Sequence, residues 1–306
     1  GSILIPAMVA QGYDAGFSSA LSAISGSLGT VIPPSITFII YGMITGESIG
    51  DLFLSGIIPG LIFGFMLCIM VFIKSKKNGW KGETQRASLK EIGRLLLDTI
   101  WGLLSPVIVL GGIYSGLFTP TEAAAVAVVY SLIVGIFIYK ELRLAELKET
   151  LFSTAKTTGM ILLIIMNAGI FSWVLTQQGI AASLTEMALA LTDNKYIMLV
   201  IINIVFLCAG CVMDNTSALY ILVPIIMPIA KALDINMIQL GVILVLNLSI
   251  GQVTPPVGPN LYVAADIGKV KFEEICRKMV PLLLMSLLAL LCITYIPALS
   301  LCLIPS

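Results

Sequence analysis

Two stretches decide the fold: residues 27–34 read SLGTVIPP, and residues 249–256 read SIGQVTPP. They are separated by an offset of 222 residues (249 − 27). A frame shared without a gap over the surrounding sequence indicates an internal duplication. The same offset aligns Pro6 with Pro228, Ala10 with Ala232, Gly46 with Gly268 and Pro59 with Pro281.

The composition is that of a membrane protein. Of 306 residues, 58% are hydrophobic and 11% are charged, and the mean hydropathy is +1.05. This leaves too little polar surface to coat a soluble globule. Apolar runs long enough to cross a bilayer recur, for example residues 52–73 and 279–301. We therefore predict an all-α polytopic membrane protein.

Composition also excludes or weakens other classes of function. The net charge is zero and no basic stripe lies outside the loops, which argues against nucleic-acid binding. The chain has no histidine, the commonest general base and metal ligand, which disfavours a membrane enzyme. Cys208 and Cys211 lie in an apolar run without a second pair, so we interpret them as packing thiols rather than as a zinc site.

Basic residues predict the orientation of the chain, because cytoplasmic loops are enriched in lysine and arginine. The first copy of the repeat is followed by the acidic Glu47 and Asp51, and the second copy is followed by basic residues. The two copies are therefore predicted to point in opposite directions. The three basic clusters are Lys74, Lys76, Lys77, Lys81, Arg86, Lys90 and Arg94, then Lys140, Arg143, Lys148 and Lys156, then Lys269, Lys271, Arg277 and Lys278.

Residues 197–230 are apolar but interrupted at the polar residues 214–217. Both ends must lie outside if residues 236–267 run inward to the third basic cluster. We therefore predict a re-entrant helical hairpin, with its tip surrounded by protein or by a watered cavity. Inverted repeats with interrupted helices are typical of secondary transporters that bind their solute where the breaks meet.

The Pro-Pro breaks predict cation ligands. Proline removes amide donors, so carbonyl oxygens between Gly29 and Ile32 and between Gly251 and Thr254 should lack helical partners and can ligate a hard cation. The half-helices that begin after the prolines direct positive amino ends toward the same region and favour an anion. The alternative is a kink that only improves packing. Further oxygen ligands of the kind sodium takes are available from Ser27, Thr30, Asn247, Gln252 and Thr254.

Two carboxylates receive different interpretations. Asp214 would be costly at membrane depth and is a functional candidate, although a hairpin tip in bulk water is the alternative. Glu122, just after Pro120, is expected to cap a helix rather than to couple ions.

These residues together resemble the large membrane subunit of tripartite ATP-independent periplasmic (TRAP) transporters. The resemblance covers essentially the whole chain, and in combination its motifs are highly specific. We expect the family's first hairpin to begin upstream of Gly1, together with site residues that cannot be named from this sequence. The matching residues are 1–6, 29–35, 54–60, 118–124 and 247–258.

The resemblance implies an elevator-type transporter in the bacterial inner membrane. It implies sodium-coupled uptake of an organic acid anion, such as sialic acid or a C4-dicarboxylate, delivered by a periplasmic substrate-binding protein. It also implies a small four-helix membrane subunit, separate or fused, as a partner. No cofactor is expected besides sodium as the coupling ion. The rivals are a stand-alone dicarboxylate or citrate symporter, which needs no binding protein, and a polytopic membrane enzyme.

Site residues are carried over by position, with oxygen-bearing neighbours added. Gly29, Thr30 and Pro33 are implied for one sodium site, and Asp214, Gly251 and Thr254 for the other. The predicted sodium-binding set is Ser27, Gly29, Thr30, Pro33, Asp214, Asn247, Gly251 and Thr254. The predicted substrate-binding set is Ser35, Asn215, Pro256 and Asn260.

The predicted organisation alternates transport and scaffold elements. Residues 1–50 and 196–278 hold the transport elements of the two repeats. Residues 51–158 hold scaffold helices, with an amphipathic surface arm at residues 89–97. Residues 159–195 form a linking span and an outer interfacial segment, and residues 279–306 a final scaffold helix.

Overall fold

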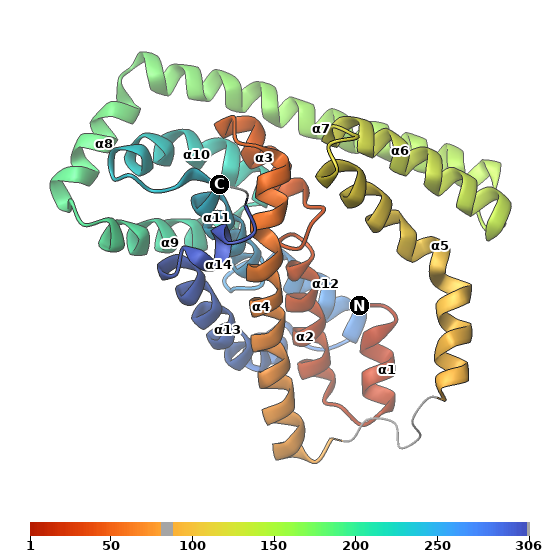
Figure 1. Ribbon diagram of the computed structural model, residues 1–306. Helices are drawn as coiled ribbons and strands as arrows, with labels where there is room; N and C mark the ends of the chain where they lie inside the picture. Colours follow the sequence, from red (N-terminus) through yellow and green to blue (C-terminus); the bar gives the residue numbers. More distant parts are fainter. Residues whose placement is uncertain (81–87, 305–306) are drawn as a thin grey trace. The chain divides into compact units, whose positions relative to one another are not determined.

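The computed structural model describes residues 1–80 and 88–304, and every regular element in them is a helix (Figure 1). Seven of the described helices are long and apolar enough to cross a membrane, which confirms the predicted all-α polytopic class. The chain forms two compact units, residues 1–83 with 168–306, and residues 84–167. Lys81 and Arg86 of the first basic cluster lie outside the described residues.

The larger unit contains both copies of the repeat, and their helices begin in register. Shifted by 222, the first residues of α2, α3 and α4 fall on 237, 258 and 271, where the second copy begins helices at 237, 259 and 272. The duplication read from the sequence is therefore present in the structure. The first copy comprises α1 (Leu4–Ala10), α2 (Ala15–Leu28), α3 (Ile36–Thr45) and α4 (Ile49–Asn78). The second comprises α10 (Asn215–Ala232), α11 (Met237–Gly251), α12 (Pro259–Gly268) and α13 (Phe272–Tyr295), followed by α14 (Ala298–Leu301).

The two copies pack on each other reciprocally. Helix α2 packs against α13, and its counterpart α11 packs against α4. Such exchange of equivalent contacts is the pattern of a two-fold relationship between two similar bodies.

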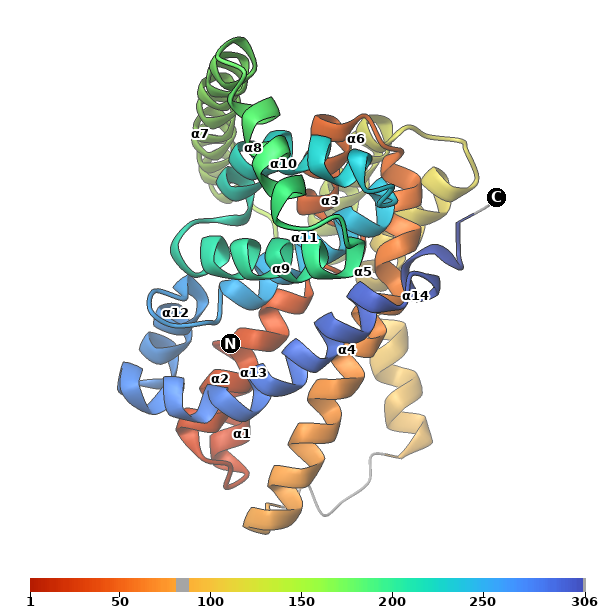
Figure 2. The same cartoon turned by 90° about the vertical axis from the view of Figure 1, so that its left-hand side faces the viewer.

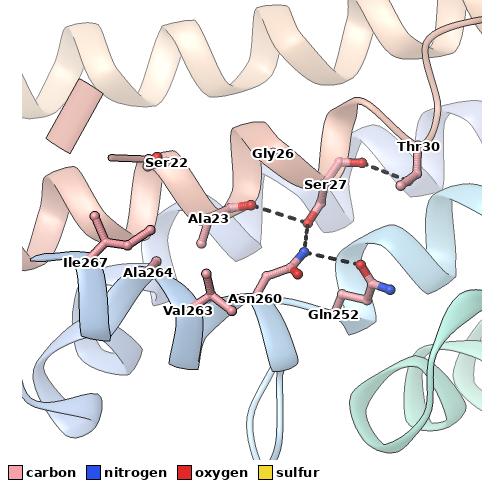
Figure 3. A pocket seen from close by; sticks show the side chains of 11 residues that line it. Ser22, Ala23, Gly26, Ser27, Thr30, Gln252, Asn260, Val263, Ala264 and Ile267 are labelled. Atoms are coloured by element: carbon pink, nitrogen blue, oxygen red, sulfur yellow. Dashed lines mark hydrogen bonds between the residues drawn. The ribbon is translucent and has the colours of Figure 1, made fainter. Parts of the chain in front are cut away.

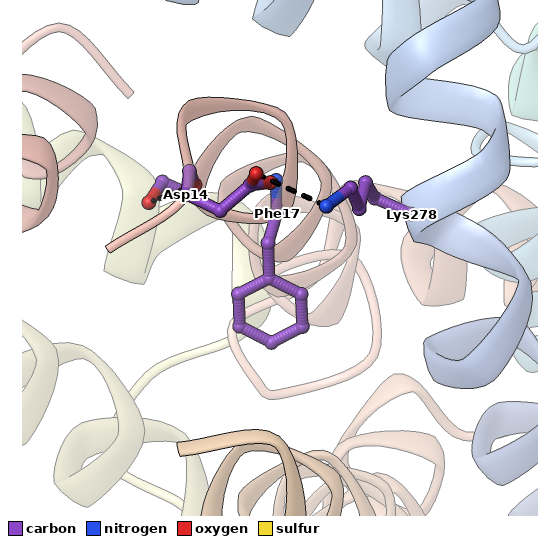
Figure 4. Close-up of polar contacts among 4 residues, drawn as sticks. Asp14, Phe17 and Lys278 are labelled. Carbon is purple, nitrogen blue, oxygen red and sulfur yellow. Dashed lines mark hydrogen bonds and ion pairs between the residues drawn. The ribbon is translucent and has the colours of Figure 1, made fainter. Parts of the chain in front are cut away.

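One end of this unit gathers the start of α2, the start of α13 and the end of α4. Asp14 caps α2 by accepting a 2.8 Å hydrogen bond from the Phe17 amide, and its carboxylate lies 3.0 Å from the Lys278 ammonium of α13 (Figure 4). The ring of Trp80, just beyond α4, lies 5.1 Å from the ring of Phe17. The basic residues that end α4 and begin α13 therefore share one end, as the charge pattern predicts.

The opposite end gathers the start of α11 and the start of α4. The Tyr41 hydroxyl donates a 2.6 Å hydrogen bond to the Met237 carbonyl oxygen, and Gly241 lies against Tyr41 and Leu52. Helix α4 has 30 residues and is therefore about 45 Å long. Helices α2 and α11 begin at opposite ends of it (Figure 2), which confirms that the repeat is inverted.

Helices α9 (Lys195–Val212) and α10 form the predicted hairpin. At its open end the Lys195 ammonium donates a 2.7 Å hydrogen bond to the Asp234 carbonyl oxygen. At its tip the Gly258 amide donates to the Cys211 carbonyl oxygen at 3.3 Å. The tip therefore lies beside the break after α11, and the re-entrant course of the hairpin stays a prediction. Helix α8 (Ile180–Leu191) precedes the hairpin.

The smaller unit contains α5 (Leu89–Tyr114), α6 (Pro120–Ile133), a π-helix (Val134–Ile138) and the first part of α7 (Leu144–Gln177). The Tyr130 hydroxyl donates to the Trp101 carbonyl oxygen at 2.6 Å, so α5 and α6 run out and back as expected. Residues 89–97 form the first part of α5 rather than a helix of their own, and their predicted place at the membrane surface stays a prediction. Between Leu97 and Pro106 the sequence contains only one weak helix breaker, Gly102, and Pro106 itself lies inside the same helix.

Candidate functional site at the two broken helices

Both copies break their helix at the same place. Residues 29–35 separate α2 from α3, and residues 252–258 separate α11 from α12. The Pro33–Pro34 and Pro255–Pro256 peptide bonds are both cis. Each break therefore exposes a run of backbone outside helical geometry, as the proline pattern predicts.

Several backbone carbonyl oxygens of the breaks remain available. Within the part of the chain that the structure describes, no donor bonds the carbonyl oxygens of Gly29, Val31, Ile32, Val253 or Thr254. These oxygens match the predicted lack of helical partners and are of the type that hard cations bind.

Other carbonyl oxygens that were expected to be free are occupied. The Ser35 hydroxyl donates to the Thr30 carbonyl oxygen at 2.5 Å, and the backbone amide of Asn260 donates to the Gln252 carbonyl oxygen at 3.2 Å. The Gly251 carbonyl oxygen accepts from the Thr254 amide at 2.9 Å. Sequence reasoning missed these bonds, because a short break leaves its own polar neighbours within reach of its carbonyl oxygens.

The two breaks and the helix turns that flank them contact each other through side chains. The hydroxyl oxygens of Thr30 and Ser249 lie 2.5 Å apart. The Asn260 side-chain amide donates to the Ser27 hydroxyl at 3.0 Å and to the Gln252 side-chain oxygen at 3.2 Å (Figure 3). Ser27, Thr30 and Asn260 are thus brought together from opposite copies. Sequence reasoning did not single out Ser249, which contacts Thr30 but does not line the cavity described below, although it aligns with Ser27 in the repeat.

A cavity of about 330 Å³ opens beside these contacts, between α2 and α12 (Figure 3). Its polar lining consists of Ser22, Ser27, Thr30, Gln252 and Asn260. Among the described residues no ionisable side chain lines it. An ion or polar solute held there would be stabilised by hydroxyls, amides and backbone dipoles rather than by a counter-charge.

The hairpin tip residues occupy a different position. Asp214 is exposed and caps α10, accepting hydrogen bonds from the Ser217 amide at 3.0 Å and the Ser217 hydroxyl at 2.6 Å. Asn215 is buried, and its Oδ1 has no hydrogen-bond partner among the described residues. Neither residue lines the cavity. The tip still adjoins the second break through Cys211, and the predicted roles of Asp214 and Asn215 stay predictions.

Asn247 belongs to a buried polar chain one turn before the second break. It is fully buried, and its Nδ2 donates to Asn203 Oδ1 of α9 at 2.6 Å. Asn203 in turn donates to the Thr294 hydroxyl of α13 at 3.2 Å. Asn247 Oδ1 has no partner in the described chain, so one predicted ligand oxygen remains free. Asn203 carried no signal in the sequence beyond being polar within an apolar helix.

The remaining predicted residues lie within the breaks. The Thr254 hydroxyl donates to the Ile250 carbonyl oxygen at 2.7 Å, and Ser35 is buried and caps α3 at the Phe38 amide. Gly251 ends α11, while Pro33 and Pro256 lie in the non-helical runs. None of these residues is among those that line the cavity.

Glu122 has the structural role expected of it. Thr119 caps α6, its hydroxyl accepting from the Glu122 amide at 3.3 Å, while the Glu122 carboxylate accepts from the Thr119 amide at 2.8 Å. This reciprocal pair is a capping box.

Comparison with known protein families identifies the family of this chain. The model of the DctM component of tripartite ATP-independent periplasmic transporters matches residues 1–299. The chain belongs to this TRAP transporter family. The TRAP family and the seven apolar helices together make it a multi-pass protein of the bacterial inner membrane and part of a transporter, not an enzyme.

Individual TRAP relatives differ in what their names say they carry. The chain is 42% identical over 303 residues to the C4-dicarboxylate large permease protein of Pseudomonas aeruginosa, covering 99% of this chain and 71% of that protein. It is 36% identical over 301 residues to the sialic acid large permease protein of Vibrio cholerae, covering 98% and 70%.

A third relative is much longer than the chain. The isethionate permease protein of Oleidesulfovibrio alaskensis is 41% identical over 298 residues, covering 97% of this chain but 47% of that protein. The chain therefore spans about half to seven tenths of these relatives. Similar identities to three differently named transporters mean that TRAP family membership alone does not select the solute.

Proposed function

We propose that the chain is the solute-conducting subunit of a sodium-coupled importer of an organic acid anion, of the sialic acid or C4-dicarboxylate class. The observation that carries the proposal is the meeting of two oppositely directed broken helices. Thr30 and Ser249 join the breaks directly, and Asn260 bridges Ser27 and Gln252. Binding sites of secondary transporters lie where such discontinuous helices face each other.

Sodium binding is supported by the oxygen atoms of the breaks. The first site takes the carbonyl oxygens of Gly29 and its neighbours with the hydroxyls of Ser27 and Thr30. The second takes Gly251 and Thr254 with Asp214 at the adjoining hairpin tip. A hard cation prefers such oxygen ligands, and unwound backbone supplies them in coupled transporters.

Anion binding is supported by the half-helices that follow the breaks. Helices α3 and α12 begin at Ile36 and Pro259, so both present the positive ends of their dipoles to the break region. The α12 N-cap, Gly258, offers no side chain to the first amides of that helix. The Asn260 and Leu261 backbone amides already donate to the Gln252 and Gly258 carbonyl oxygens, so the helix dipoles rather than free amides favour a carboxylate of the solute, with the Asn260 and Ser35 side chains as neighbouring contacts.

Alternating access is proposed to follow an elevator mechanism. The broken helices and the hairpin move as the transport domain, while α4, α13 and the helices of residues 84–167 form the scaffold. A small four-helix membrane subunit, separate or fused, completes the scaffold, and a periplasmic binding protein delivers the anion.

Uptake into proteoliposomes tests this proposal. The complete transporter carrying this chain is reconstituted, and uptake of labelled sialic acid or of a labelled C4-dicarboxylate is followed with and without an inward sodium gradient and purified binding protein. We expect uptake to require both. Equal uptake without the binding protein would instead support a stand-alone symporter. Equal uptake without a sodium gradient would exclude sodium as the coupling ion.

Two variants of Asp214 separate ion binding from helix capping. Asn is as good an N-cap as Asp, so Asp214→Asn keeps the α10 cap and removes only the charge. Asp214→Ala removes both. We expect both variants to weaken sodium activation, with Thr254→Ala behaving similarly. Sodium activation that is normal in Asp214→Asn but lost in Asp214→Ala would assign the residue to the cap alone.

A further inference from the structure

The residues that join the two copies near the breaks occupy equivalent positions in the repeat. The 222-residue offset pairs Ser27 with Ser249 and Thr30 with Gln252. Thr30 and Ser249 are in direct hydroxyl contact, and the equivalent pair, Gln252 and Ser27, is joined through the two protons of the Asn260 side-chain amide. The four aligned residues therefore form two equivalent links across the two-fold relationship, one direct and one bridged.

The hydroxyls of Thr30 and Ser249 make three short oxygen–oxygen contacts but carry only two protons. Thr30 Oγ1 lies 2.8 Å from the Ser27 carbonyl oxygen, and Ser249 Oγ lies 2.7 Å from the Val245 carbonyl oxygen. The two hydroxyls also lie 2.5 Å from each other. Each hydroxyl carries a single proton. Only two of the three contacts are hydrogen bonds at one time, so the direction of donation can switch.

A cation at the first break selects one direction. When Thr30 Oγ1 ligates a cation, the positive charge repels a proton arriving on the same oxygen. Ser249 then cannot donate to Thr30 and directs its proton to Val245 on α11. The last turn of α11, which ends at Gly251, is thereby held in one hydrogen-bonded arrangement by a cation bound to the other copy.

We propose that Ser249 is a positioning residue that couples the two sodium sites, so that occupancy of the first break favours binding at the second. This inference rests on the proposed function and adds to it a residue outside the predicted ion ligands. Coupling between two sites is reciprocal, so sodium at the second break must equally favour sodium at the first.

The test is the sodium dependence of uptake by the complete transporter. Ser249→Ala removes the hydroxyl and leaves the predicted ligands of both sites in place. We expect the Hill coefficient for sodium to fall from about 2 toward 1. We expect the half-saturating sodium concentration to rise roughly threefold to tenfold, the range that one net hydrogen bond supplies. The maximal rate at saturating sodium should stay within about twofold of the wild type, because uncoupled sites still fill.

Ser286→Ala is the matched control. Ser286 is also fully buried and also donates to the carbonyl oxygen four residues earlier, that of Leu282, at 2.9 Å. Among the described residues no hydrogen bond joins it to the other copy's break, so its loss should leave the Hill coefficient unchanged. If Ser249→Ala is not recovered from the membrane, Ser249→Cys takes its place, since a thiol is only a weak donor, and the same loss is expected.

The possible outcomes distinguish failure of the coupling role of Ser249 from failure of the proposed transport function. A sodium-dependent wild type with an unchanged Hill coefficient in the Ser249 variant overturns the coupling and leaves the transporter proposal standing. An equal fall in the Ser286 variant also overturns it, since any buried hydroxyl would then act alike. A wild type without sodium dependence removes the proposed function and the coupling together.

Discussion

Gly210 of the hairpin and Gly251 of α11 touch through their backbones. A Cβ atom added to Gly251 would lie 2.6 Å from the Gly210 backbone, and one added to Gly210 would lie 3.1 Å from the Gly251 Cα atom. Only glycine allows two helices to approach this closely. The position of the hairpin tip beside the second break therefore depends on this pair.

Gly251→Ala is expected to separate the hairpin from α11, because the obstructing atoms are backbone and cannot rotate away. Overpacking of this kind costs about 1 to 3 kcal/mol, measured as a lower midpoint of thermal unfolding in detergent. The control is Gly169→Ala in α7, where an added Cβ meets nothing within 4 Å. There, alanine should be neutral or stabilise the helix by about 0.5 to 1 kcal/mol. Equal midpoints for the two variants would contradict the close approach.

Asp14 performs two tasks that substitutions can separate. Asp14→Asn keeps the cap on the Phe17 amide but removes the ion pair with Lys278, and Lys278→Met also removes only the ion pair. Both side chains of the pair are about one third exposed, so each change should cost less than about 1 kcal/mol. Asp14→Ala also removes the cap and should cost about 1 kcal/mol more. Thermal unfolding at low and high salt checks this ranking, and only the ion-pair part should depend on salt.

The fold was largely predictable because its signals are local or periodic. The 222-residue frame located both breaks, the contrast between acidic residues such as Asp51 after the first copy and basic residues such as Lys271 after the second indicated the inversion, and the polar interruption at Asp214 marked the hairpin tip. Each signal survives in the sequence because proline, glycine and charge constrain the backbone or its environment wherever they occur. The predicted end of the arm at Leu97 was wrong because no strong stop signal follows that residue and the helix continues to Tyr114.

The site was only partly predictable because its contacts join distant parts of the chain. The residue types at the breaks indicated oxygen ligands, and Ser27, Thr30 and Asn260 do meet. Nothing in the sequence showed that Ser249 would contact Thr30, 219 positions away. Which carbonyl oxygen a hydroxyl such as Ser35 occupies depends on rotamers and packing rather than on sequence spacing.

The capping box of α6 predicts that Glu122 is replaceable in transport. Glu122→Gln keeps an acceptor for the Thr119 amide, and a capping box accepts Gln at this position. We expect normal sodium activation in this variant, measured as uptake against sodium concentration. Thr119→Ala should lower the unfolding temperature without changing the sodium dependence. Loss of sodium activation in Glu122→Gln alone would show that the carboxylate has a coupling role.

Labelling of single cysteines tests the inversion. The free cysteines Cys68, Cys208 and Cys302 are exposed, so all six native cysteines are first replaced. Asp51 lies in the first turn of α4, and Lys271 immediately precedes α13, the corresponding helix of the other copy. Because the copies are inverted, a membrane-impermeant maleimide added to intact cells whose outer membrane it passes should label Asp51→Cys. It should label Lys271→Cys only after the inner membrane is opened.

The control for this labelling is Lys77→Cys at the far end of α4. Trp80 and the Asp14–Lys278 pair place that end with the start of α13, so Lys77→Cys should follow Lys271→Cys and not Asp51→Cys. Because Lys77 and Asp51 belong to one helix, opposite labelling of these two also shows that α4 crosses the membrane. Labelling of Asp51→Cys and Lys271→Cys from the same face would mean that the copies are parallel, and the broken helices could then not face each other from opposite sides of the bilayer.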